Sequence, residues 1–322
     1  MPSLTRFVRT DWFGPLLACI VAIAIIQSVS PTFLSLANIQ VLLLALAVNA
    51  LIAFSQMIII AIGQMNLSVG AIGGLAAIAF AGAMEVWGLP APLAALFGLI
   101  IGLACGALNG LLVRISGMSA FVITLATLSI YKGVNLGITE AQAFYGVPQA
   151  VKAFGSAVIA GPVPWLVAPT ALVAVWLWFM LRRQPVGRFI LAVGGNEHAA
   201  ELSGVSIART VVTAHAISGL LAALAGILLV ARLGVGQPSI GDDWLILSFA
   251  APVIGGAVLS GGSVSVAATL LGVVIVAIIT QALVLFSIDP YLTQVILGGL
   301  ILAAVSFNRL RESRFIGRFG RA

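Results

Sequence analysis

Stretches of about twenty apolar residues follow one another along almost the whole chain. A helix that crosses a ~30 Å hydrocarbon core needs about 20 mainly apolar residues, because each residue advances about 1.5 Å. Of the 322 residues, 61% are apolar and only 7% are charged, and the mean hydropathy is +1.21. A soluble domain cannot bury so much apolar surface, so the sequence predicts an all-α integral membrane protein.

Segments rich in Gly, Ala, Leu, Val and Ile favour helices over barrel strands, in which lipid-facing and lumen-facing residues alternate. Polar residues, Gly and Pro divide the chain into about ten predicted transmembrane helices, which form one domain over residues 1–322. The predicted spans are 13–30, 39–62, 67–84, 91–113, 119–138, 164–181, 211–231, 244–259, 264–286 and 291–307. Arg6 and Arg9 precede the first span as in a signal sequence, but Pro31 argues against cleavage, so we expect an uncleaved helix.

The distribution of Lys and Arg predicts the orientation, because basic residues near span ends stay on the cytoplasmic side. With the N-terminus inside, twelve of the 15 Lys and Arg residues are cytoplasmic. The outer side receives Lys132, Lys152 and Arg232. We therefore expect both termini in the cytoplasm, a periplasmic loop at 139–163 and a cytoplasmic loop at 182–209. The net charge of +6 then reflects topology and does not indicate nucleic-acid binding.

Residues with chemical reactivity are sparse. The acids lie near span ends or in loops, which disfavours a proton-coupled carrier, and no phosphate-binding Gly-x-x-x-x-Gly-Lys-Ser/Thr loop is present. His198 and His215 have no companions at metal-ligand spacing, and Cys19 and Cys105 read as packing residues. Lys132 is the one charge well inside a span, and we expect it to snorkel to the outer surface rather than line a cavity.

Two polar, glycine-rich interruptions fall at similar places in the two halves of the chain. The first, at 63–70, lies in an apolar run that would be about twice the bilayer thickness as one helix. The second is at 254–263. Such pairs point to a transport pathway, although ordinary tight turns give the same pattern. The residues assigned to the pathway are Asn66, Ser68, Gly70, Gly255, Gly256 and Ser260. We expect the first two in a non-helical stretch that faces protein or a water-filled cavity.

The segment 196–204 of the cytoplasmic loop has the features of a short capped helix. Asn196 is a good N-cap, Glu197 lies in the first turn where the helix dipole favours negative charge, and Gly204 can end the helix in a left-handed conformation. A two-turn helix is marginal alone and needs a partner surface, whereas an ordinary re-entry loop needs none. The apolar positions expected to be exposed are Ala199, Ala200 and Leu202.

Three motifs in this order resemble the membrane permease subunits of ribose-type ABC sugar importers. The loop pattern of that family, Gly-Arg…Ala-x-Gly-x-Asn…Ala-Ala…Ser-Gly, stands at Gly187, Arg188, Ala192, Gly194, Asn196, Ala199, Ala200, Ser203 and Gly204. The family's Gly-Ile-Asp-Leu-Ser-Val-Gly is similar to residues 64–70, and its Gly-Gly…Leu-Ser-Gly-Gly to residues 255–262. Asn66 stands in place of the usual aspartate and Gln64 in place of a usual glycine.

The resemblance implies a type II ABC importer permease-like bundle with two related halves, in the inner membrane of a bacterium. It implies as partners a second permease copy or close paralogue, a cytoplasmic ABC ATPase, a periplasmic substrate-binding protein and membrane lipid. ATP and Mg would bind to the ATPase, so we expect no cofactor and no enzymatic activity on this chain. The residues expected to couple to the ATPase are Gly195, Asn196, Glu197, Ala199, Ala200, Leu202, Ser203 and Gly204.

Other functions stay open at this point. Related permeases for branched-chain amino acids or nucleosides share the loop pattern more loosely. An ion-coupled secondary carrier would need no ATPase, and an intramembrane transferase would need clustered acids for magnesium and phosphate, which the sequence lacks. The sequence therefore predicts an import permease for a sugar or sugar-like solute without naming the solute.

Overall fold

The computed structural model describes residues 12–289 continuously and scattered residues between 292 and 306. Eight of the 17 positions of the predicted span 291–307 lie outside the described residues. The helices in chain order are α2 (Phe13–Val29), η1 (Pro31–Leu34), α3 (Leu36–Ala61), α4 (Val69–Glu85), α5 (Ala91–Ser116), α6 (Ala120–Thr139), α7 (Gln149–Ser156), α8 (Val167–Arg183), α9 (Pro185–Gly195), α10 (Glu197–Leu202), α11 (Ile207–Leu233), α12 (Trp244–Ile254) and α13 (Val266–Leu285).

Helices of membrane-spanning length and composition form the frame of the bundle. In the described part of the chain, α3, α5, α6, α11 and α13 have 20 to 27 residues and the apolar composition of a membrane span. The shorter apolar helices are α2, α4, α9 and α12. This architecture confirms a helical membrane protein. One predicted span is wrong in length, because 244–259 contains only the 11-residue helix α12.

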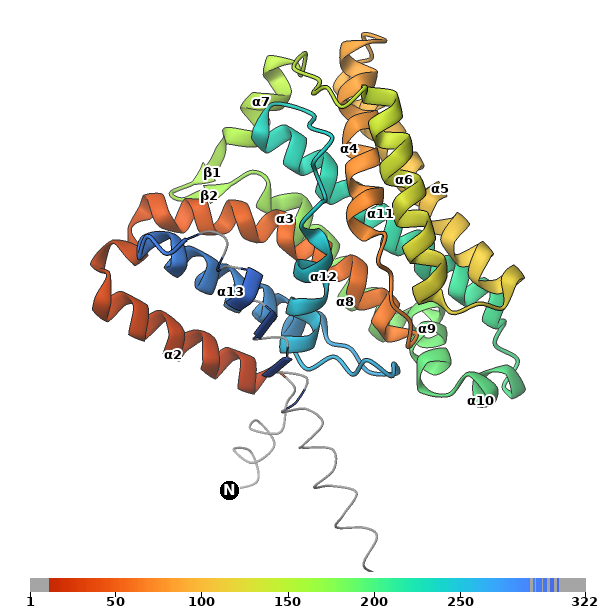
Figure 1. Ribbon diagram of the computed structural model, residues 1–322. Coiled ribbons are helices and arrows are strands. Elements are labelled where there is room, and N and C mark those ends of the chain that lie inside the picture. Colours follow the sequence, from red (N-terminus) through yellow and green to blue (C-terminus); the bar gives the residue numbers. More distant parts are fainter. Residues whose placement is uncertain are drawn as a thin grey trace, which may run out of the picture.

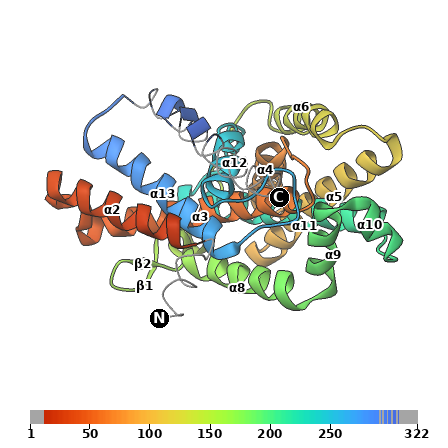
Figure 2. The ribbon, with the colours of Figure 1, turned by 90° about the horizontal axis from the view of Figure 1, so that it is seen from below.

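Helix α11 lies at the centre of the bundle. Helix α11 packs against α3, α4 and α5, while α13 and α12 pack against α3. Figures 1 and 2 place α2 and α13 at one end of the molecule and α5 at the other. From Ala50 to Ala61 every residue of α3 is buried, so this stretch contacts protein on all sides.

Small residues allow the closest helix contact, as the glycine pattern of α5 predicts. A Cβ atom added at Gly102 would overlap the Ala223 side chain, and one added at Gly106 would overlap the His215 carbonyl oxygen of α11. Close backbone approach through glycine is the usual device for helix packing in lipid, where no hydrophobic driving force operates between helices.

The predicted periplasmic loop at 139–163 has structure of its own. It contains α7 and the strand β1 (Val158–Ala160), which pairs antiparallel with β2 (Val163–Pro164). This small hairpin is a departure from the predicted all-α fold. Gly155 of α7 packs on the Ala231 carbonyl at the end of α11, far along that helix from its junction with α10. Figure 1 accordingly shows α7 and α10 at opposite ends of the bundle.

A further non-helical stretch, residues 234–243, packs on the bundle with Gly236, Ile240 and Gly241 buried and its other residues partly or fully exposed. The sequence predicts an outer loop here, but the chain runs back along α4 before α12 begins, as Figure 1 shows. The points of contact pair Gly236 with Ala81, Ile240 with Gly74 and Gly241 with Gly70. The contacts descend eleven residues of α4, which is about 16 Å at 1.5 Å per residue. We call residues 234–243 the descending segment.

The descending segment explains why α12 is short. Since the chain has already travelled back along α4 without forming a helix, α12 begins beside the first turns of α4, where Trp244 packs on Gly70 and Gly73. Its 11 residues span about 16 Å, roughly half of the hydrocarbon core. The prediction missed this because a Gly/Pro-rich stretch between two apolar runs also reads as a surface turn. The signal available in the sequence is Gly234, Gly236, Pro238 and Gly241 within eight residues.

Candidate functional site

The short helix predicted in the cytoplasmic loop forms as α10. The Asn196 side chain accepts a hydrogen bond from Ala199 N at 2.9 Å, which satisfies one of the free N–H groups at the helix start. Gly204 follows the helix with φ of 82°, a conformation that glycine adopts without strain. Both ends of the helix are therefore set by the residues that the sequence indicates.

The two alanines of α10 have different environments, and one prediction about them is wrong. Ala199 is exposed, as expected, but Ala200 is buried in the apolar core, and its carbonyl accepts from Val205 N. Leu202 is 77% exposed. A six-residue helix turns one side inward, and which side is buried depends on the neighbouring helices rather than on its own sequence. The exposed apolar surface of α10 therefore centres on Ala199 and Leu202.

The two interruptions and the cytoplasmic loop meet at one point, which we call the glycine junction. It consists of Gly63, Gly194, Gly261 and Gly262. Gly262 N donates to the Ala61 carbonyl at 3.0 Å, so the second interruption is hydrogen-bonded to the end of α3. A Cβ at Gly194 would overlap that same carbonyl, and a Cβ at Gly63 would lie 2.8 Å from the Ser260 carbonyl oxygen. The backbones are in contact, and no side chain fits between them.

Residues of the second interruption have distinct roles. Gly255 packs against the Ala268 carbonyl of α13, where a Cβ would lie 2.5 Å from the oxygen. Gly256 has φ of 84° and Gly261 φ of 94°, and both conformations favour glycine. Ser260 is exposed, and its carbonyl faces Gly63. This interruption is therefore a shaped turn that connects the two antiparallel helices α12 and α13.

The first interruption contains a fully buried hydrogen-bonded cluster around Asn66. The Asn66 amide nitrogen donates to Ser218 Oγ at 3.2 Å, and its oxygen accepts from both the N–H and the hydroxyl of Ser68 at 2.9 and 2.8 Å. Asn109 donates to Ser68 Oγ at 2.8 Å and accepts from the Tyr131 hydroxyl at 3.0 Å. Asn66 and Ser68 lie in a non-helical stretch that faces protein, which confirms that prediction.

The Asn66 backbone is held as well. With its amide nitrogen toward the Asn66 carbonyl, Gln56 donates at 2.9 Å and accepts from Asn66 N at 3.3 Å. Nearby, His215 Nε2 lies 2.9 Å from Gln64 Oε1. The side-chain amide of Asn66 therefore acts as a donor to Ser218, which the carboxylate usual in the resembling family cannot do.

None of the six residues assigned to the pathway lines a cavity above the short helix α12. This cavity, which we call the outer cavity, has a volume of about 510 Å³. Its lining comes from α3, α11, α12, α13 and the residues after α13. The lining residues are Ala45, Val48, Asn49, Leu229, Arg232, Asp243, Trp244, Ile246, Leu247, Thr280, Leu283, Val284, Ile288 and Gln294. It lies beyond the start of α12, on the side that the sequence predicts to be the outer one.

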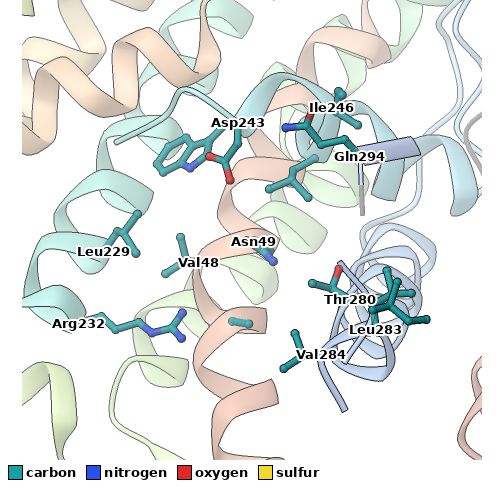
Figure 3. A pocket seen from close by; sticks show the side chains of 14 residues that line it. Val48, Asn49, Leu229, Arg232, Asp243, Ile246, Thr280, Leu283, Val284 and Gln294 are labelled. Carbon is teal, nitrogen blue, oxygen red and sulfur yellow. The ribbon is translucent and has the colours of Figure 1, made fainter. Parts of the chain in front are cut away.

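Charged and polar side chains enter this cavity from separate helices. Figure 3 shows Asn49 between Arg232 and Thr280, with Asp243 and Gln294 on another side. Neither Arg232 nor Asp243 has an ion-pair partner among the described residues. Ionisable side chains within a membrane bundle usually face its interior or a water-filled cavity.

Two ion pairs link separate elements of the described structure. Glu197 of α10 pairs with Arg114 at the end of α5, with 3.2 Å between Oε1 and the guanidinium nitrogen. Lys132 pairs with Asp242 of the descending segment, a partner that the sequence did not indicate, and its side chain is 30% exposed. Among residues 12–289, no group of three or more His, Cys, Asp and Glu side chains is placed to hold a metal ion.

Comparison with known proteins gives a consistent result over nearly the full chain. The family described as "Branched-chain amino acid transport system / permease component" matches residues 38–305. The ribose import permease protein RbsC of Bacillus subtilis (strain 168) is 37% identical over 303 residues, 93% of each chain. The D-allose transport system permease protein AlsC of Escherichia coli (strain K12) is 35% identical over 302 residues, 93% of this chain and 92% of AlsC. The xylose transport system permease protein XylH of the same strain is 29% identical over 366 residues, which cover 93% of this chain and 92% of XylH. No solved structure gave a significant match.

Proposed function

Because the chain belongs to the family of branched-chain amino acid transport system permease components, we propose that it is the membrane permease subunit of an ABC importer for a sugar. The relatives named above are permeases for ribose, allose and xylose, and they match over nine-tenths of the chain. Their names support a sugar over an amino acid or a nucleoside as the solute.

The proposal includes the setting of the subunit. We place it as one multi-pass domain in the inner membrane of a bacterium, with about ten spans in two related halves and both termini in the cytoplasm. Its partners would be a second permease copy, a cytoplasmic ATPase that binds ATP and Mg, and a periplasmic substrate-binding protein. The chain itself would bind no cofactor and catalyse no reaction.

The glycine junction is the observation that carries the mechanism. It joins the end of α9 to the end of α3 and to the turn between α12 and α13 through backbone contacts. Three of these helices, α3, α12 and α13, also line the outer cavity. Because rigid backbone contacts transmit displacement without slack, a movement of α9 and α10 would shift the walls of the cavity. Closure of the ATPase against α10 would supply that movement.

The exposed part of α10 offers the surface for the ATPase. Ala199 and Leu202 are exposed apolar residues on a helix too short to be stable alone. The exposed ion pair between Glu197 and Arg114 adds a weak link from the helix to the end of α5. A load applied to α10 would therefore reach the glycine junction mainly through α9, against which α10 packs.

Substitution of Leu202 tests this function. We expect Leu202→Arg to leave thermal unfolding of the purified permease unchanged, because the side chain points away from the bundle. Co-purification of the ATPase and ATP-dependent uptake of sugar into proteoliposomes should both fall at least tenfold, since a buried unpaired charge costs several kcal/mol. Leu202→Met keeps an apolar side chain of similar volume and should retain both.

Ala200→Arg provides the contrasting control. Ala200 is buried in the permease itself, so the arginine should lower thermal stability before any partner is added. Normal ATPase association and uptake in Leu202→Arg would contradict the docking role of α10. Uptake that needs an ion gradient and no ATPase would contradict the proposal as a whole.

A further inference from the structure

The outer cavity owes its existence to the shortness of α12. Helix α13 has 20 residues and α12 has 11, and the contacts of Gly272 with Ala251 and of Gly255 with Ala268 show that α12 pairs with the first half of α13. The second half of α13, including Thr280, Leu283 and Val284, therefore has no helix α12 beside it and lines the cavity instead. The fold holds this space open beside α13, and two further cavities in the described part of the chain have similar volumes, of about 480 and 490 Å³.

The polar side chains of the cavity carry balanced charge. Arg232 brings one positive charge from the end of α11, and Asp243 one negative charge from the start of α12. The neighbouring carboxylate, Asp242, does not line the cavity and is paired with Lys132. Asn49, Thr280 and Gln294 add neutral groups that both donate and accept hydrogen bonds.

We infer that the outer cavity is a binding site for an uncharged polyhydroxylated solute of monosaccharide size, occupied during passage through the permease. This inference rests on the proposed function and names the class of ligand that the permease itself selects. A guanidinium only donates and a carboxylate only accepts, whereas a sugar hydroxyl does both and can bridge them. A volume of about 510 Å³ lies in the usual range for small-molecule sites.

Charge balance disfavours solutes that carry a net charge. A zwitterion such as an amino acid could pair with both groups, and the sugar permeases among the relatives decide in favour of a neutral sugar. The carboxylate of a sugar acid would be attracted by Arg232 and repelled by Asp243. The ammonium group of an amino sugar would be attracted by Asp243 and repelled by Arg232. Each charged solute also loses hydration on entry, and in a cavity of balanced charge that loss is not repaid by a net attraction. The same reasoning predicts that removal of Asp243's charge makes the cavity prefer an anionic sugar, and that removal of Arg232's charge makes it prefer a cationic one.

Binding to the full-length permease in lipid nanodiscs, without ATPase or binding protein, tests the site directly. Saturation-transfer NMR would use D-ribose, D-allose and D-xylose as neutral probes, D-galacturonate as the anionic probe and D-glucosamine as the cationic probe. We expect at least one neutral probe to bind about tenfold more tightly than either charged probe.

Two variants and one neighbouring control sharpen the test. Asp243→Asn should weaken the bound neutral sugar about tenfold, as loss of a hydrogen bond to a charged group does, and should make D-galacturonate bind more tightly than the neutral probes. Arg232→Gln should instead favour D-glucosamine. Asp242→Asn changes the adjacent carboxylate outside the cavity and should leave the order of preference unchanged.

Several outcomes would overturn the inference. Equal binding of neutral and charged probes would contradict the inference that the cavity binds a neutral sugar. So would an order of preference that none of the variants changes. If no probe binds and native mass spectrometry shows that Asp243→Asn or Arg232→Gln dissociates a permease dimer, the cavity is an interface between copies. ATP-dependent uptake by the complete importer separates the two proposals. Normal sugar uptake without cavity binding defeats this inference alone, and absence of sugar uptake defeats the proposed function.

Discussion

The glycine junction and the descending segment are both non-helical stretches within the bundle, but they are held in different ways. At the glycine junction, backbone meets backbone from three parts of the chain, and no side chain takes part. The descending segment rests on α4 through glycines and is tied to α6 by side chains, where Asn135 donates to the Pro238 carbonyl at 3.1 Å and Lys132 pairs with Asp242. One region is held by backbone contacts that include a backbone hydrogen bond, and the other also by a side-chain hydrogen bond and an ion pair.

The difference teaches where each region tolerates change. Contacts between backbones cannot relax when a methyl group is added, whereas a side-chain tie can be removed without displacing the chain. A rigid junction suits a part that transmits force, and separable ties suit a part that has to move. The descending segment precedes α12 and the second interruption follows it, so both regions adjoin the helix whose start lines the outer cavity.

The largest effect should come from the glycine junction. Gly194→Ala places a methyl group against the Ala61 carbonyl and 2.7 Å from Gly262 N, so α9 must separate from α3. Overpacking of this kind costs about 1–3 kcal/mol and sometimes more, and we expect a lower unfolding temperature together with strongly reduced ATP-dependent uptake.

Gly195→Ala is the matched control for that change. The nearest atom to a Cβ at Gly195 is the Gly262 Cα at 4.0 Å, which is ordinary contact. The control should keep the normal unfolding temperature, because it adds no overlap. If both variants behave alike, close packing at the glycine junction is not what couples the helices.

The features that were predictable from sequence are those set by nearby residues. The caps of α10 depend on Asn196 and Gly204, and the break before α4 follows from the length of the apolar run, so each could be predicted locally. The convergence of Gly63, Gly194 and Gly261 could not, since the three are distant in sequence. The motifs that contain these glycines point to transport and coupling, but nothing in the sequence shows that the three glycines touch each other.

The errors have a common physical origin in tertiary structure. The burial of Ala200 depends on which side of α10 meets the bundle, and the path of residues 234–243 depends on the glycine surface of α4. The outer cavity was missed because it requires knowing that α12 stops short. Arg232 was counted only as an outer basic residue, although it lines that cavity.

A medium effect is expected at Asn135, which is 1% exposed and has no partner for its side-chain oxygen in the described structure. Asn135→Asp keeps the shape, but when ionised it has no donor and places a carboxylate oxygen against the Pro238 carbonyl. We expect it to lower the free energy of unfolding by about 1–3 kcal/mol. Asn135→Leu also loses the bond, but it removes the unpaired oxygen as well, so its loss should be clearly smaller. The reverse order in thermal unfolding would show that the hydrogen bond does not hold the descending segment.

The smallest effect should come from the ion pair between Lys132 and Asp242, whose side chains are 30% and 53% exposed. A pair in contact with water is worth about 0–1 kcal/mol and is screened by salt, whereas loss of one partner from a buried pair costs about 3–5 kcal/mol. We therefore expect Lys132→Met to reduce thermal stability slightly at low salt and not at high salt. Lys152→Met on α7 removes a lysine that has no ion-pair partner among the described residues, and should show no such salt dependence. A large loss that salt does not change would mean that water does not reach the pair, and the descending segment would then be as rigid as the glycine junction.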